Sequence, residues 1–191
     1  MTTRKSTNLF LAFLALFVFS GCIGSSSSYY VLSVASQPSH VYARKNKVIA
    51  VQKVSVPGYL FKREIAVASS SSQISFLGAS WGEDLDEGLT NRLIGFLQKK
   101  FNQPTVYHYP WGLDNQPDIK VAVNISRFIA QNGVVYLDAS WSLESFKRNK
   151  RVARLFSTSV ATQSDATHIV NAMDQAFARF EESVAQGISQ F

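Results

Sequence analysis

The feature that most constrains this chain is its single cysteine, Cys22, which stands shortly behind an unbroken apolar run from Leu9 to Phe19. A basic start at Arg4 and Lys5, an apolar stretch of eleven residues and small residues after it are typical of a secretory signal. A membrane-spanning helix, which needs roughly 20 apolar residues, is the weaker alternative. Because the chain has no second cysteine, no intramolecular disulfide can hold an exported domain together.

The residues Phe19-Ser20-Gly21-Cys22 resemble the lipobox of bacterial lipoproteins, with Phe19 in place of the usual leucine. In that motif the cysteine thiol takes a diacylglyceryl group, the signal is cleaved, and an N-acyl chain usually follows. The alternative is an ordinary signal peptide followed by a free thiol. Since an unpaired thiol is unusual in an exported protein, the sequence favours covalent lipid on Cys22 and gives no sign of another cofactor.

These signals divide the chain into three parts. Residues 1–21 are expected to be a cleaved lipoprotein signal peptide, residues 22–28 the lipidated cysteine with a serine-rich tether, and residues 29–191 a single periplasmic domain. Several lipid chains on one cysteine suffice for stable membrane anchoring. Ile23 follows the cysteine, whereas Asp there is the inner-membrane retention signal in enteric-type bacteria. We therefore expect the periplasmic face of the outer membrane rather than the inner membrane.

Strand and helix patterns fill the part of the chain after the tether. Alternating or β-rich segments predict strands at 29–34, 47–56, 64–68, 73–77, 104–111, 118–128, 135–143 and 152–161. Asn132-Gly133 predicts a tight hairpin, and a phase shift at Arg127 predicts a β-bulge. Apolar residues at three- and four-residue spacings predict one helix at 84–101 and another that begins at Ser164 or Asp165. The expected fold class is α+β, an antiparallel β-sheet packed on one face by two long α-helices.

The charge of the chain is basic without being extreme. The formal net charge of +6 falls to +4 when Arg4 and Lys5 leave with the signal. Much of the excess forms one candidate basic patch around a predicted turn: Lys147, Arg148, Lys150, Arg151 and Arg154. A solvated hairpin turn explains this patch, and attraction to anionic lipid headgroups or to an acidic partner is the alternative. No nucleic-acid-binding motif accompanies it, so we expect no nucleic-acid partner.

Catalytic and metal-binding patterns are absent from the sequence. The histidines His40, His108 and His168 lack metal-ligand spacing. The acidic residues from Glu83 to Glu87 are accounted for by the positive end of the predicted helix dipole. We therefore expect no enzyme, no catalytic residues and no metal.

Large aromatic and apolar residues mark a second candidate surface. Tyr59, Leu60 and Phe61 follow a Pro-Gly turn, and Trp81 precedes the first predicted helix. These four residues are a candidate partner or lipid surface, and the alternative is that they belong to the core.

Five segments follow one another over nearly the whole mature chain: Tyr29-Tyr30-Val31-Leu32, Val54-Ser55-Val56-Pro57-Gly58-Tyr59-Leu60, Trp81-Gly82-Glu83-Asp84-Leu85-Asp86-Glu87-Gly88-Leu89-Thr90, Arg127-Phe128 and Leu137-Asp138-Ala139-Ser140-Trp141-Ser142-Leu143. In order and spacing they resemble the PqiC/YmbA-type auxiliary lipoproteins of ABC-type lipid transport systems, which work alongside MCE-domain proteins. Family members often carry Arg-Pro after the tyrosine-leucine pair, where this chain has Phe61-Lys62-Arg63-Glu64.

The resemblance implies a non-enzymatic component of a system that moves phospholipid or related apolar molecules between the inner and outer membranes. It would dock an MCE-domain periplasmic protein, whose ABC permease and ATPase are separate chains, at the outer membrane, and it could act as a homo-oligomer. The residues alone leave open a monomeric lipid-binding carrier, an assembly factor for outer-membrane components and, last, an envelope hydrolase.

Overall fold

The computed structural model describes residues 28–43, 46–110 and 116–191, so the expected signal peptide, Cys22 and most of the tether lie outside the described residues. The strands are β1 (Tyr29–Tyr30), β2 (Ile49–Gln52), β3 (Glu64–Ala68), β4 (Ile74–Trp81), β5 (Val106–Tyr109), β6 (Ile119–Gln131), β7 (Val134–Ser145) and β8 (Lys150–Ala161). A 3₁₀ helix, η1 (Gly58–Phe61), and two α-helices, α2 (Leu85–Phe101) and α3 (Ala166–Gln190), complete the described elements.

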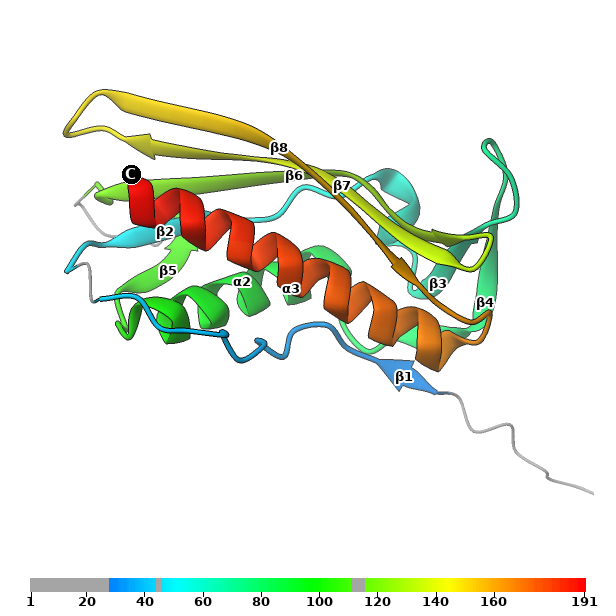
Figure 1. Ribbon diagram of the computed structural model, residues 1–191. Helices are drawn as coiled ribbons and strands as arrows, with labels where there is room; N and C mark the ends of the chain where they lie inside the picture. Colours follow the sequence, from blue (N-terminus) through cyan, green and yellow to red (C-terminus); the bar gives the residue numbers. More distant parts are fainter. Residues whose placement is uncertain (1–27, 44–45, 111–115) are drawn as a thin grey trace, which may run out of the picture.

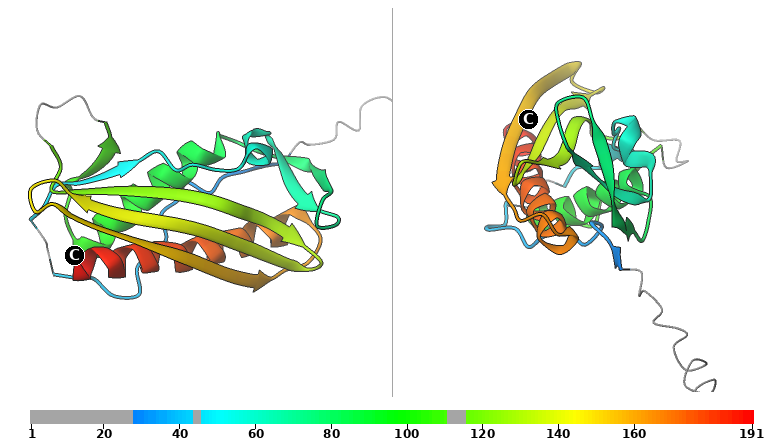
Figure 2. Two further views of the ribbon diagram at one scale, coloured as in Figure 1. Left: turned by 90° about the horizontal axis from the view of Figure 1, so that it is seen from above. Right: turned by 90° about the vertical axis from the view of Figure 1, so that its right-hand side faces the viewer.

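The strands form one sheet, and both α-helices lie against the same face of it (Figure 1). Helix α3 packs under β7 and β8, whereas α2 packs under β2 and β5 (Figure 2). This arrangement confirms the α+β class and the two long helices on one face.

The sheet is mixed, which corrects the expectation of an antiparallel one. Strands β6, β7 and β8 form an antiparallel meander, and β3 and β4 form an antiparallel hairpin. However, β2 runs parallel to β5 and β6, β3 runs parallel to β6, and β1 runs parallel to β4. Helix α2 carries the chain back between β4 and β5, and a crossover of this kind lets strands run parallel. Alternation of side chains gives the faces of a strand but not its direction.

Both helices begin and end where the local chemistry favours it. Asp84 is the N-cap of α2, and Asn102 ends this helix in the left-handed conformation with φ of 45°. Asp165 caps α3, since its side chain accepts a hydrogen bond of 3.1 Å from the backbone N–H of His168. The predicted helix boundaries are confirmed to within a residue or two.

The long hairpin of β6 and β7 turns at the predicted dipeptide. Asn132 and Gly133 both have positive φ, 50° and 74°, which is the requirement of the two-residue turn that matches strand twist. The pairing of β6 with β7 shifts between Ile125 and Arg127, so the predicted bulge is confirmed.

The core lies between the helices and the sheet. Alternate residues of β6 and β7 face it and are buried, and they meet the apolar stripes of α2 and α3. The tightest approach is at Gly187 of α3, where an added β-carbon would lie 2.2 Å from Cη2 of Trp141. None of the helices among the described residues has the length and apolar character to cross a bilayer.

The two faces of the sheet predict unequal responses to leucine truncation. Leu137 of β7 is 0% exposed and Leu155 of β8 is 89% exposed. Leu137→Ala should lower the free energy of unfolding by about 2–5 kcal/mol because it leaves a cavity. The matched control, Leu155→Ala, should change it by less than about 0.5 kcal/mol. Chemical denaturation followed by circular dichroism measures both, and equal losses would contradict this placement of the core.

Candidate functional site

The candidate aromatic surface is mostly interior. Leu60 and Trp81 are 3% and 2% exposed. These two residues therefore belong to the core, which was the alternative to a partner or lipid surface. Tyr59 is half-buried, and its hydroxyl accepts a hydrogen bond of 3.0 Å from the backbone N–H of Phe128, next to the bulge in β6. Burial raises the pKa of Tyr59. Of the four residues only Phe61, at 66%, is largely exposed.

Phe61 stands at a shallow cleft between η1 and the start of α2. The cleft measures about 270 Å³ and is lined by side chains of both signs: Lys53, Leu60, Phe61, Lys62, Arg63, Glu83, Asp84, Leu85 and Asp86. An ion pair of 2.8 Å joins Lys53 to Asp86 across it. The mixed charge leaves no net attraction for an anionic headgroup here.

The candidate basic patch surrounds the turn between β7 and β8, and much of it packs on the domain. Lys147 forms an ion pair of 2.8 Å with Asp118, which together with the backbone N–H of Val48 lowers the pKa of this carboxyl. Arg148 donates to the carbonyl of Phe191 at 2.6 Å, and Nζ of Lys150 lies 4.7 Å from the centre of the Phe191 ring.

The two predicted surfaces lie at opposite ends of an elongated domain. Strand β1 lies at one end, where Tyr30 pairs with Trp81 and the backbone N–H of Ser80 donates to the carbonyl of Ser28 at 3.2 Å (Figure 1). The turn between β7 and β8 is at the far end of the sheet, near the C-terminal residue (Figure 2). The structure therefore does not bring the aromatic and basic candidates together.

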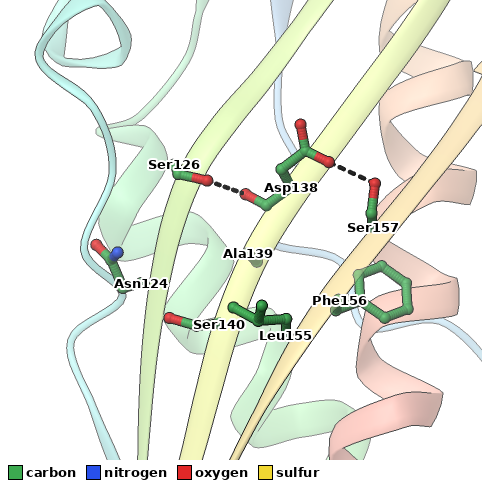
Figure 3. A pocket seen from close by; sticks show the side chains of 8 residues that line it. All are labelled: Asn124, Ser126, Asp138, Ala139, Ser140, Leu155, Phe156 and Ser157. Atoms are coloured by element: carbon green, nitrogen blue, oxygen red, sulfur yellow. Dashed lines mark hydrogen bonds between the residues drawn. The ribbon is translucent and has the colours of Figure 1, made fainter.

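The helix-free face of the sheet carries a trough lined mainly by small polar side chains. About 520 Å³ in volume, it is bounded by Asn124, Ser126, Asp138, Ala139, Ser140, Leu155, Phe156 and Ser157 (Figure 3). Within it Ser157 donates to the carboxylate of Asp138, and Ser126 donates to the carbonyl of Asp138 at 3.1 Å. Because its polar groups are largely bonded to one another, the trough offers hydrogen-bonding edges rather than an apolar pocket.

The histidines take structural hydrogen bonds in separate places. His108 bonds Asn91 at 2.7 Å, His168 contacts the helix cap Asp165 at 2.6 Å, and His40 lies beside Ser39 at 3.3 Å. Within the described ranges no three His, Cys, Asp or Glu residues are grouped so as to hold a metal ion.

A polar cluster between α2 and α3 was not predicted from the sequence. Arg92 is fully buried and donates to Glu181, also fully buried, at 3.2 Å, and it forms a second ion pair with Asp174. Burial raises the pKa of Glu181 to about 7, although the Arg92 guanidinium opposes that shift. In a sequence, a single charged residue in a predicted helix looks like an exposed position, so no pattern predicted that Arg92 and Glu181 are buried together.

The segment 31–43 crosses both helices on the side away from the sheet, and we call it the strap (Figure 1). Ser36 donates to Glu181 at 2.9 Å, and Lys99 donates to the carbonyl of Ala35 at 2.9 Å. The backbone N–H of Tyr42 donates to the carbonyl of Lys100 at 2.7 Å. These contacts fasten the chain that follows the tether to both helices.

The comparisons with known proteins agree with this architecture. A family model for the ABC-type transport auxiliary lipoprotein component matches residues 30–185. A search of curated protein sequences finds no significant match.

Solved structures share the fold at low identity. A crystal structure of an uncharacterized protein matches with a TM-score of 0.71 and 23% identity, covering 86% of this chain and 99% of that one. Protein XCC0632 from Xanthomonas campestris, of the DUF330 family, matches with a TM-score of 0.67 and 16% identity, covering 86% of this chain and 98% of that one. At these identities the likenesses show the fold alone.

The buried pair predicts a dependence of stability on pH. The pKa of Glu181 is about 7 in the folded chain against an ordinary 4.5, so between these values the folded state binds more protons than the unfolded state. The free energy of unfolding should therefore fall as pH rises through this window, by on the order of 1 kcal/mol per pH unit at the steepest, and level off above it.

Glu181→Gln should flatten this part of the curve, because the amide cannot ionise. Glu87→Gln, at an exposed position of α2, is the control and should keep the slope of the unchanged chain. Urea denaturation at a series of pH values measures all three, and an unchanged slope in Glu181→Gln would assign the dependence to other groups.

Proposed function

Since this chain belongs to the family of ABC-type transport auxiliary lipoprotein components, we propose that it is a non-enzymatic lipoprotein anchored through Cys22 at the periplasmic face of the outer membrane. There it docks an MCE-domain periplasmic protein, whose ABC permease and ATPase are separate chains, in a system that moves phospholipid or related apolar molecules. Self-association of the anchored domain is part of the proposal, since a ring would complete a conduit.

The filled interior is the observation that carries docking over a monomeric lipid carrier. A carrier would hold its lipid between sheet and helices, as apolar ligands are held in largely preformed cavities. That space is occupied by large side chains buried to 2% exposure or less: Phe96, Phe101, Phe128, Trp141, Phe177 and Phe180. The cleft at η1 and the trough on the sheet are instead open to solvent and lined by polar as well as apolar side chains.

The position of the tether supports a docking role. Ser28 is six positions after Cys22, and an extended chain spans at most about 3.6 Å per residue, so the β1 end stays within roughly 20 Å of the anchor. Strand β8 has 12 residues, which at about 3.4 Å each carry the opposite end roughly 40 Å further along the sheet. A periplasmic partner would therefore meet the end that bears the basic patch.

The test is crosslinking and affinity purification of the acylated chain from envelopes, with mass spectrometry of partners and co-purifying lipid. We expect an MCE-domain protein to be recovered. A monomer with one bound lipid and no such partner would contradict docking and favour the carrier.

A variant of the anchor gives the matching control. Cys22→Ala should abolish acylation, since the thiol is the site of attachment, and leave an unprocessed or membrane-released chain. Mass spectrometry of the intact protein and fractionation of the envelope check this. Acylated Cys22→Ala chain in the outer membrane would disprove the assignment of the lipid to Cys22.

A further inference from the structure

Strand β8 lies at the edge of the sheet. It pairs with β7 in unbroken register from Lys150 to Ala161, and no other strand of the described residues lies beside it. Its sequence contains neither proline nor glycine. Long edges of this kind are templates for another strand, and proteins commonly shorten them or interrupt them.

Hydrogen bonds elsewhere in the sheet fix which backbone groups point outward. The N–H of Ser55 donates to the carbonyl of Val123 at 3.1 Å, and the N–H of Ile125 donates to Ser55 at 2.8 Å. The backbone N–H and C=O groups of Val123 and Ile125 therefore point away from β7. Those of Asn124, between them, point toward Ser140 of β7.

The same alternation continues outward. Because the backbone groups of Ser140 point to β6, those of its neighbour Trp141 point to β8, where Trp141 pairs with Arg154. The backbone groups of Ala153, Leu155 and Ser157 consequently face the open edge. An independent contact agrees, since Arg179 of α3 reaches the carbonyl of Ser159 from outside the sheet at 3.0 Å.

The open edge is basic. Arg151 projects on the helix-free face, and Arg154 on the helix side lies 5.9 Å from the ring of Trp141. Of the nearby carboxylates, Glu144 forms an ion pair of 2.7 Å with Lys120, whereas Asp138 accepts a hydrogen bond from Ser157 and keeps its charge. Between the cations of the turn and Arg179 stands Leu155, 89% exposed.

We propose that the free edge of β8 binds an extended acidic segment of a partner protein by strand addition. Backbone groups of residues 151–157 supply the ladder, and Leu155 and the flanking arginines select an apolar residue bordered by carboxylates. A second copy fits less well. Antiparallel pairing of two β8 strands about Leu155 would set Arg151 against Ser159, where Arg179 lies, and parallel pairing would set arginine beside arginine.

This inference does not require the partner to be an MCE-domain protein. If affinity purification recovers no MCE-domain protein, strand addition at β8 is not contradicted. If strand addition at β8 fails its own test, the anchored docking role is not contradicted.

A photoreactive amino acid at Leu155 tests the proposal in envelopes that contain the full-length lipidated chain. We expect an adduct with a partner protein, with the crosslinked peptide rich in Asp and Glu when mapped by mass spectrometry. The control is the same amino acid at Phe76 of β4, which is 45% exposed and should not capture that peptide.

Two test substitutions and one control show whether formation of the adduct depends on the edge of β8. Ala153→Pro removes an N–H that faces the open edge but no bond to β7, and it should reduce the adduct about tenfold. Ala153→Ser keeps the N–H and should leave the adduct intact. Arg151→Glu should reduce it by a similar factor, and it keeps the test valid if the proline variant melts early by circular dichroism.

Four results would overturn the proposal. They are an adduct insensitive to both Ala153→Pro and Arg151→Glu, a crosslinked peptide without acidic residues, an adduct to β8 of a second copy, and no adduct at Leu155.

Discussion

The structure depends on the close packing of α3 against β7. Gly187 lets the helix backbone meet the indole of Trp141, and Nε1 of that indole donates to Ser183 on the same helix at 3.2 Å. About two to three turns before Gly187 in α3, Phe180 and Phe177 fill the layer, with ring centres 5.4 Å apart. A larger residue at 187 would push the helix outward and open the core. Because this layer is closed, any recognition by the domain has to take place on its outside.

The buried pair of Arg92 and Glu181 is costly, and its position suits coupling rather than stability. A buried ion pair often contributes little net stability, since desolvation offsets the attraction. Here the carboxylate of Glu181 also accepts from Ser36 of the strap, and Lys100, fully buried, forms an ion pair of 2.6 Å with the neighbouring Glu182. The two helices and the strap are thereby joined to one another by polar contacts.

Local signals in the sequence predicted local structure. The cap at Asp165, the turn at Asn132-Gly133 and the stripe of α2 each depend on residues close together in the chain, and each is confirmed. Strand direction and strand partners depend on residues far apart in the chain. The position of β2 between β5 and β6 could therefore not be predicted from local patterns. Which of the aromatic candidates are exposed also depends on distant segments: Leu60 and Trp81 are buried, while Phe61 is exposed.

The basic patch looks like one feature in the sequence but divides into two in space. Lys147 and Arg148 turn back onto Asp118 and the C-terminal residue, where they fix the end of the hairpin. Arg151 and Arg154 continue along β8, on opposite faces of an edge that has no neighbour among the described strands. Charges at an edge usually prevent pairing with unselected strands. The same charges admit a strand of opposite sign, so an edge protected by arginine is both safe from aggregation and selective for an acidic partner.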